Sequence, residues 1–177
     1  MNDRFNKMLK VILQNEGGYV NDPSDSGGET KYGISKRAFP SLDIKNLTVE
    51  QAGEIYYKNY YLACRADAIV NNELAMQVFD HSVNAGVSKA IKLLQKCAGV
   101  TQDGVVGVNT RDKVNSQDLV MQYIEERKKF YVAISSGKNK KFLNDPELTV
   151  DTSGNVKAYP SPLSKFIFLL CCKFRKW

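Results

Sequence analysis

An amphipathic helical pattern that ends abruptly at two glycines is the strongest constraint on how this chain folds. Apolar residues recur three and four positions apart over residues 5–13, which is the pattern of a helix that buries one face. The glycine pair at 17–18 follows at once, and glycines commonly end helices. We therefore predict a helix over residues 3–15, with Asn2 or Asp3 as its N-cap.

Glu16 stands on the last turn of this predicted helix, directly before the glycines. We expect its side chain to be half-buried and close to the negative end of the helix dipole. Both conditions disfavour ionisation of a carboxyl group. A carboxyl that stays protonated near neutral pH can act as a general acid. The alternative is an ordinary exposed carboxylate at a helix end.

The stretch from Val20 to Ile34 is rich in Asn, Asp, Pro, Ser and Gly. These residue types form turns, and several of them tolerate positive φ angles. Val20 and Ile34 are the apolar ends of the stretch and could pair as a short ribbon. We predict one short β-hairpin or compact loop beside the end of the first helix.

Five further helices are predicted after the hairpin. Thr48 and Gln51 have the spacing of a capping box, Ser88 and Ser116 are candidate N-caps, and Gly86 is a stop signal. The fold class we expect is therefore mainly α, with about six helices and one hairpin. The predicted spans are 48–60, 72–84, 88–97, 108–114 and 116–135, and the last of these is a core helix.

Positive charge is concentrated at the C-terminal end. Residues 126–177 hold 11 Lys and Arg against 4 Asp and Glu, whereas residues 1–125 have a net charge of −1. A basic half suggests a polyanionic partner, and nucleic acid, anionic lipid and the anionic polymers of a bacterial wall all qualify. The alternative is a solvated basic face.

Cysteine and histidine usage gives no reason to expect a metal, a cofactor or a disulfide framework. The cysteines at 64, 97, 171 and 172 are scattered, and His81 is the one histidine. Zinc sites are built from clustered Cys and His ligands.

The longest apolar run, residues 166–172, is far shorter than the about 20 residues of a membrane-spanning helix. Charged residues interrupt the N-terminal apolar pattern, so we expect no signal peptide.

The sequence from Glu16 to Ser35, EGGYVNDPSDSGGETKYGIS, resembles the signature of the glycoside hydrolase family 108 lysozymes. These are N-acetylmuramidases of phage endolysins and prophage-derived bacterial proteins. Residues 47–61 resemble the second helix of the family, residues 79–86 resemble its FDxxVNxG element, and residues 94–110 are similar to its small peptidoglycan-binding part. The resemblance covers residues 3–134 and fades after Lys141.

The resemblance implies a lysozyme-like helical domain with the hairpin near the N-terminal catalytic helix. It divides the chain into a catalytic region at 1–86, a peptidoglycan-binding-like helical region at 87–135 packed on it, and a divergent basic tail at 136–177. The tail could attract the protein to an anionic wall or membrane, or its apolar residues could pack back on the core.

The resemblance also implies a function. The protein would be a bacteriolytic hydrolase that cleaves the β-1,4 bond between N-acetylmuramic acid and N-acetylglucosamine, with Glu16 as general acid and no cofactor. One alternative is a lytic transglycosylase in which Glu16 is the sole acid and base. Another is a non-catalytic wall-binding scaffold that keeps the fold.

Peptidoglycan glycan strands are the partner that the resemblance implies, with no nucleic acid and no transmembrane segment. We expect a monomer that is made in the bacterial cytoplasm and acts at the cell wall or periplasm. Release through a holin is the route that the family suggests.

Cleavage of a glycosidic bond needs an acid and a second group that activates or holds water near an oxocarbenium-like transition state. Asp25 and Thr30 follow Glu16 in a loop able to fold back over the helix end, and phage-type lysozymes use a similar Glu, Asp, Thr arrangement. We assign Asp25 as base or electrostatic stabiliser and Thr30 as the residue that orients water. Asp22 is the rival of Asp25. Both aspartates could instead only cap turns, and Thr30 could be an ordinary strand residue.

Three further residues are candidates for substrate binding. Tyr19 and Tyr32 could stack on sugar rings, because an aromatic ring offers an apolar face and a polar edge; they could equally be core residues. Asn84 could reach an acetamido group, although an Asn at a helix end is commonly a cap. The tyrosines at 56–61 are more typical of core and rim than of a sugar subsite.

Overall fold

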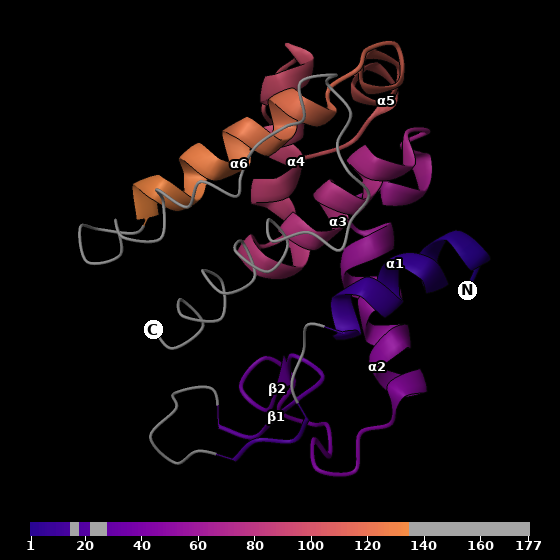
Figure 1. Cartoon of the computed structure of the whole chain (residues 1–177), viewed down its shortest axis with the longest axis vertical. Coiled ribbons are helices and arrows are strands. Elements are labelled where there is room, and N and C mark those ends of the chain that lie inside the picture. Colours follow the sequence, from indigo (N-terminus) through magenta and orange to yellow (C-terminus); the bar gives the residue numbers. More distant parts are fainter. Residues whose placement is uncertain (15–17, 22–27, 135–177) are drawn as a thin grey trace, which may run out of the picture.

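The computed structural model of the chain describes residues 1–14, 18–21 and 28–134. Within these residues the fold is mainly helical with one two-stranded antiparallel hairpin (Figure 1), which confirms the predicted class. The α-helices are α1 (Asp3–Gln14), α2 (Val49–Tyr56), α3 (Asn72–Ala85), α4 (Val87–Ala98), α5 (Val108–Asn115) and α6 (Val120–Ile134); the strands are β1 (Thr30–Lys31) and β2 (Ile34–Ser35); η1 (Tyr57–Leu62) is a π-helical turn and η2 (Ala66–Ala68) a 3₁₀ turn.

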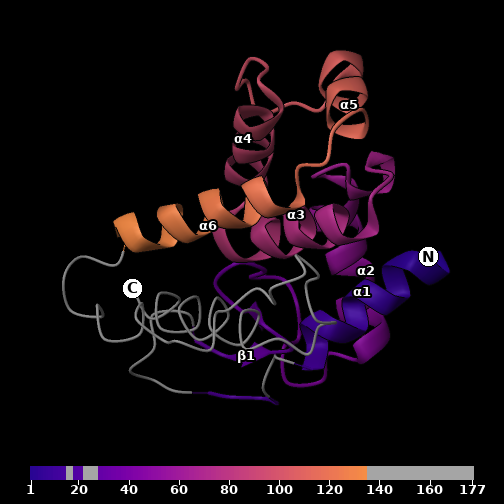
Figure 2. The ribbon, with the colours of Figure 1, turned by 45° about the horizontal axis from the view of Figure 1, so that its top comes forward.

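Helix α3 is the centre of the packing. It contacts α4, α6, η1 and η2. Figures 1 and 2 both place the hairpin at the end of the molecule farthest from α5. The hairpin therefore lies beside the N-terminal half of the helical body rather than beside α4–α6.

Helix α1 is fixed at both its start and its buried face. The Asn2 side chain accepts a hydrogen bond from the Phe5 amide at 2.9 Å, so the predicted N-cap is Asn2. The Phe5 ring is fully buried and contacts the rings of Tyr57, Tyr61 and Phe79 at centroid distances of 4.9, 5.1 and 5.9 Å. These contacts fix α1, the helix that precedes Glu16, against η1 and α3.

The capping box predicted for the second helix is present. Thr48 Oγ1 accepts from the Gln51 amide at 3.2 Å, and the Thr48 amide donates to Gln51 Oε1 at 2.9 Å. The helix does not end at Tyr60 as expected but changes from α to π geometry and continues to Leu62. Such π turns inside helices often occur near functional sites.

A two-residue turn at Tyr32 and Gly33 closes the hairpin. The strand register pairs Lys31 with Ile34, and φ is +51° at Tyr32 and +72° at Gly33. Two successive positive φ angles define a type I′ turn, which normally prefers Asn-Gly. A bulky tyrosine in this conformation is a rare and strained arrangement.

Val20 pairs with Thr30 and not with Ile34, so the predicted pairing was wrong. Two backbone hydrogen bonds of 2.8 Å join Val20 and Thr30 in an antiparallel bridge. The turn after β1 sets the register of the hairpin and places Ile34 opposite Lys31. The backbone amide and carbonyl of Thr30 are thus both bonded to Val20.

Two predicted helix starts were also wrong. Helix α4 begins at Val87, directly after Gly86, whose φ of +98° ends α3, so Ser88 lies inside the first turn and is not the cap. Helix α6 begins at Val120 and not at Ser116, whose hydroxyl donates to the last turn of α5. The Asp118 carboxylate instead accepts from the Val120 amide at 3.4 Å.

Candidate active site

The predicted acid Glu16 and the two candidate second carboxylates, Asp22 and Asp25, lie outside the described residues. The structure does describe the residues that flank them. Helix α1 ends just before Glu16, and the bridge between Val20 and Thr30 joins the two ends of the stretch that carries both aspartates. The three acidic candidates therefore belong to segments whose ends are anchored to the helical body and the hairpin.

Tyr19 is a surface residue held by an acid. Its side chain is 37% exposed, which excludes the core alternative. The Tyr19 hydroxyl donates to Glu29 Oε1 at 2.9 Å, across the same bridge that joins Val20 and Thr30. The hydroxyl is thereby fixed. The exposed ring can contact a sugar.

Thr30 is held through its backbone and weakly through its side chain. Its amide and carbonyl both bond to Val20 at 2.8 Å, and Thr30 lies opposite Ser35 in the hairpin. The Thr30 hydroxyl donates only a long contact, 3.5 Å, to the carbonyl of Gly28. A hydroxyl with such a weak internal bond remains able to bind a water molecule.

Tyr32 occupies the tip of the hairpin and is half-buried. The Lys31 ammonium lies 5.4 Å from the centre of its ring, within the range of a cation–π contact. The carbonyl of Tyr32 accepts a hydrogen bond from the hydroxyl of Tyr56 at 2.8 Å. Tyr56 is a residue of the helical body that the sequence indicated only as core or rim.

Asn84 lies near the end of α3. Its side-chain amide donates to the carbonyl of Asp80, one turn earlier in the helix, at 2.9 Å. The C-cap of the helix is Gly86, so the cap alternative for Asn84 was wrong. Within the described part of the chain, no hydrogen bond joins Asn84 to Tyr19, Thr30 or Tyr32. The structure places Tyr19, Thr30 and Tyr32 on and beside the hairpin and Asn84 near the end of α3.

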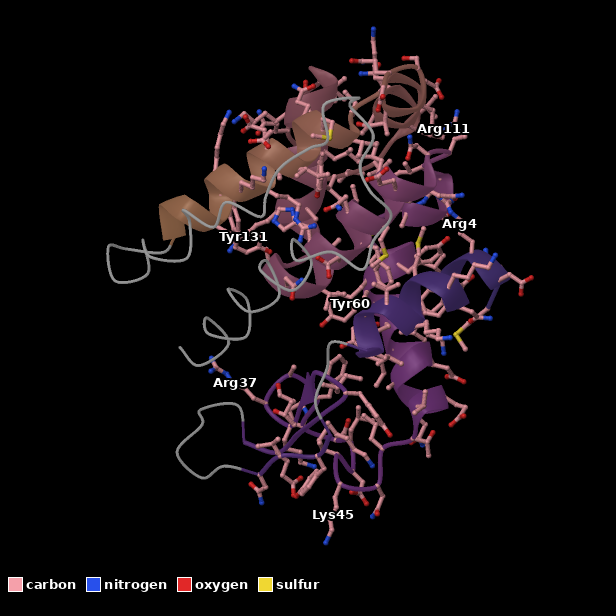
Figure 3. All side chains as sticks on the ribbon, in the orientation of Figure 1. Arg4, Arg37, Lys45, Tyr60, Arg111 and Tyr131 are labelled. Atoms are coloured by element: carbon pink, nitrogen blue, oxygen red, sulfur yellow. The ribbon has the colours of Figure 1, made fainter. Side chains whose placement is uncertain are left out.

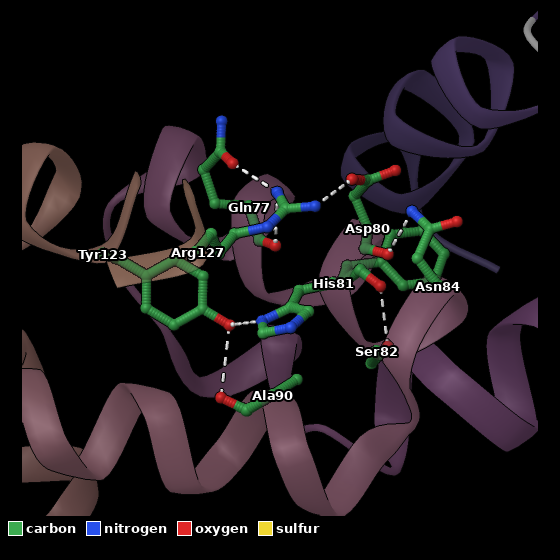
Figure 4. Close-up of polar contacts among 9 residues, drawn as sticks. Gln77, Asp80, His81, Ser82, Asn84, Ala90, Tyr123 and Arg127 are labelled. Carbon is green, nitrogen blue, oxygen red and sulfur yellow. Dashed lines mark hydrogen bonds and ion pairs between the residues drawn. The ribbon is translucent and has the colours of Figure 1, made fainter. Parts of the chain in front are cut away.

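A buried ion pair between Arg127 and Asp80 lies next to Asn84 (Figure 4). Arg127 of α6 is 1% exposed and donates to Asp80 Oδ2 at 2.6 Å and to Gln77 Oε1 at 2.5 Å. Burial is the largest influence and disfavours the charge of Arg127, but the Asp80 carboxylate together with Tyr131 and Tyr123 outweighs it and raises the pKa of the guanidinium above its usual range. This pair joins α6 to the helix that carries Asn84.

His81 lies in the same buried region, on α3. Its Nδ1 lies 3.0 Å from the Tyr123 hydroxyl, and that hydroxyl donates to the carbonyl of Ala90 at 3.2 Å. Burial, followed by the charges of Arg127 and Lys89, lowers the pKa of His81 well below its usual value. A neutral ring with its proton on Nδ1 satisfies this geometry, since the one tyrosine proton is used by Ala90. Its role is structural: it joins α3 to α4 through Tyr123 of α6.

The described residues contain no group of three or more metal-ligating side chains. Within the same residues, no helix is both long and apolar enough to span a bilayer.

Comparison with known proteins relates part of the chain to one family. Residues 9–86 match the family model described as Glycosyl hydrolase 108. Among solved structures, the chain is similar to SagA of Brucella abortus, with 28% sequence identity, a TM-score of 0.66, and coverage of 98% of this chain and 96% of that one. No curated protein sequence matches the chain. The peptidoglycan-binding-like region predicted at 87–135 lies outside the family match and stays a prediction.

The matched region contains every candidate site residue, from Glu16 to Asn84. The match supports a muramidase-type role in peptidoglycan hydrolysis. Residues 9–86 match the glycosyl hydrolase 108 family model, and the protein is a glycoside hydrolase with a lysozyme-like fold.

Proposed function

We propose that the protein is a muramidase that hydrolyses the β-1,4 bond between N-acetylmuramic acid and N-acetylglucosamine at the bacterial cell wall. The observation that carries the proposal is the bridge between Val20 and Thr30, within the region that matches the family. This bridge keeps the exposed ring of Tyr19 and the hydroxyl of Thr30 at the base of the stretch that carries Asp22 and Asp25.

In the proposed mechanism, Glu16 protonates the glycosidic oxygen as the leaving sugar departs. Asp25 stabilises the developing positive charge or activates the attacking water, and the Thr30 hydroxyl orients that water. The weak internal bond of the Thr30 hydroxyl supports this role, since little must be broken when a water binds. Tyr19 and Tyr32 would contact the sugar rings.

Product analysis tests the reaction class. Mass spectrometry of peptidoglycan digested with the wild-type protein should show fragments with reducing N-acetylmuramic acid ends. Anhydro sugars in their place would make the protein a lytic transglycosylase. Binding to peptidoglycan without any release of fragments would favour the non-catalytic scaffold.

The two candidate second carboxylates can be separated by substitution. We expect Asp25→Asn to lower kcat by about 10²-fold, the low end of what a positioned acid or base contributes, and Asp22→Asn to lower it much less. Turbidity loss of purified peptidoglycan measures both variants under the same conditions. A larger effect of Asp22→Asn would transfer the role to Asp22, and two near-normal variants would mean that Glu16 works without a second carboxylate.

The role of the Tyr32 ring in substrate binding can be separated from the role of the Tyr32 backbone in the turn. Tyr32→Asn should leave the melting temperature nearly unchanged, because two effects oppose each other. Asn tolerates the positive φ better than Tyr, but the substitution loses the packing of the ring. Loss of one aromatic contact of about 0.5–1.5 kcal/mol should raise KM by about three- to tenfold. The matched control is Tyr32→Phe, which keeps the ring and should keep KM. An unchanged KM in Tyr32→Asn would show that the ring does not contact substrate.

A further inference from the structure

Tyr56 connects the helical body to the tip of the hairpin. Its ring lies at the end of α2 and is 1% exposed. Its hydroxyl donates to the carbonyl of Tyr32, 24 residues earlier in the chain, at 2.8 Å. A bond between two segments so distant in sequence fixes how one is placed against the other.

The acceptor of this bond is the strained residue of the turn. Tyr32 has a φ of +51°, and a left-handed conformation is unfavourable for a residue other than glycine. A hydrogen bond to the carbonyl of this residue stabilises one orientation of the peptide group that follows it. The bond therefore offsets part of the cost of the left-handed conformation.

The donor is held rigidly. The ring of Tyr56 contacts the ring of Tyr60 with a centroid distance of 5.7 Å, and the helix that carries Tyr56 begins at the capping box of Thr48 and Gln51. Figure 3 places Tyr60 on the part of the helical body that borders the hairpin. The hydroxyl of Tyr56 therefore reaches the turn from a buried and well-packed position.

Two lysines of the hairpin region bond to the segment that follows the hairpin. We call residues 28–47 the hairpin lobe. The ammonium groups of Lys31 and Lys36 donate to the carbonyls of Lys45 and Leu42 at 2.9 and 2.6 Å. These bonds keep the lobe together but do not place it against the helices, which is what the bond from Tyr56 does.

We propose that Tyr56 is a positioning residue for the active site. Its hydroxyl sets the tip of the hairpin, and through the tip the hydroxyl of Thr30 and the ring of Tyr32, against the helix that precedes Glu16. This inference rests on the proposed muramidase function. It adds a residue that touches neither substrate nor water and acts through the backbone of Tyr32.

Tyr56→Phe tests the proposal, because it removes the hydroxyl and keeps the ring. Displacement of catalytic groups by about 1 Å can cost 10²-fold in rate, and we expect a fall in kcat of about tenfold or more at a temperature well below unfolding. The matched control is Tyr61→Phe. Tyr61 is also fully buried, and its hydroxyl makes no hydrogen bond of ordinary geometry with the described residues, so this variant should keep kcat within about twofold.

A second measurement does not depend on activity. Amide hydrogen exchange of peptides covering residues 28–36 should become faster in Tyr56→Phe and stay unchanged in Tyr61→Phe, since only the first variant frees the turn. The Tyr32→Asn background provides a third. In it the turn is favourable by itself, so adding Tyr56→Phe should lower kcat less than it does in the wild type.

The outcomes separate this inference from the proposed function. Hydrolysis by the wild type, combined with kcat and exchange in Tyr56→Phe that match Tyr61→Phe, would overturn the role of Tyr56 and leave the muramidase function standing. Additive effects of Tyr32→Asn and Tyr56→Phe on kcat would also overturn it. A wild type that releases no fragments would overturn the proposed function, while the exchange data would still decide whether Tyr56 positions the hairpin.

Discussion

Glu16→Gln is expected to lower kcat for peptidoglycan hydrolysis by 10²–10⁴-fold, the range that general acid catalysis typically contributes. The substitution removes the proton that Glu16 would give to the leaving oxygen and changes the side-chain volume very little. The melting temperature should therefore stay close to that of the wild type. Release of soluble fragments from purified peptidoglycan, quantified by mass spectrometry, measures the loss.

Glu54→Gln is the matched control for this experiment. Glu54 is an exposed carboxylate of α2, and its ion pair with Lys58 at 3.4 Å lies on the surface, where such pairs contribute little. This control should keep full activity. Activity of Glu16→Gln within about twofold of the wild type would remove Glu16 from the mechanism, because no general acid of that importance contributes so little.

Arg127→Met is expected to destabilise the protein by about 3 kcal/mol or more, because loss of one partner of a buried ion pair leaves the other uncompensated. Asp80 and Gln77 would both lose their bonds to the guanidinium. The side chain of Asp80 keeps some contact with solvent, at 25% exposure, which places the expected loss at the lower end of the range. For a chain of this size, the melting temperature should fall by about 6–12 °C.

Lys129→Met is the control on the same helix. Lys129 pairs with Glu126 at 2.7 Å, but its side chain is 70% exposed, so its removal should cost less than about 1 kcal/mol. Urea and thermal unfolding of both variants give the comparison. Equal stabilities of Arg127→Met and Lys129→Met would mean that the buried pair contributes no more than a surface pair.

Local signals in the sequence were sufficient for most helices. The Asn2 cap, the capping box of Thr48 and the stop at Gly86 depend on residues within one turn of each other, and all three are present. The predictions of Ser88 and Ser116 as N-caps were wrong for different reasons. Gly86 already occupies the cap position before α4, and the Ser116 hydroxyl bonds to the last turn of the preceding helix.

Long-range contacts were beyond the sequence. Arg127 lies at the spacing of the buried residues of α6 and is itself buried, but nothing local indicates that its partner is Asp80, 47 residues earlier. The bond from Tyr56 to Tyr32 spans 24 residues and was missed for the same reason. A tyrosine directly before Gly33 in a tight hairpin was the available signal, because the position favours Asn.

The sequence likewise indicated some residues of the candidate site and missed others. The motif gave Tyr19, Thr30 and Tyr32 as site residues, and the structure places them on and beside the hairpin. It did not give Glu29, whose carboxylate holds Tyr19, because a single Glu inside a turn-rich stretch has no distinctive pattern. The roles of Glu16 and Asp25 still depend on the motif, since both lie outside the described residues.

The buried contacts of α3 mean that the end of the family match, at residue 86, is not the boundary of a structural domain. The match ends at residue 86, but α3 buries its apolar face against α4 and α6, which come later in the chain. A fragment cut at residue 86 would leave Asp80 without Arg127 and His81 without Tyr123. The enzyme is therefore not a separable module joined to an accessory part, and any transplantation of its activity into another protein must carry the chain at least as far as α6.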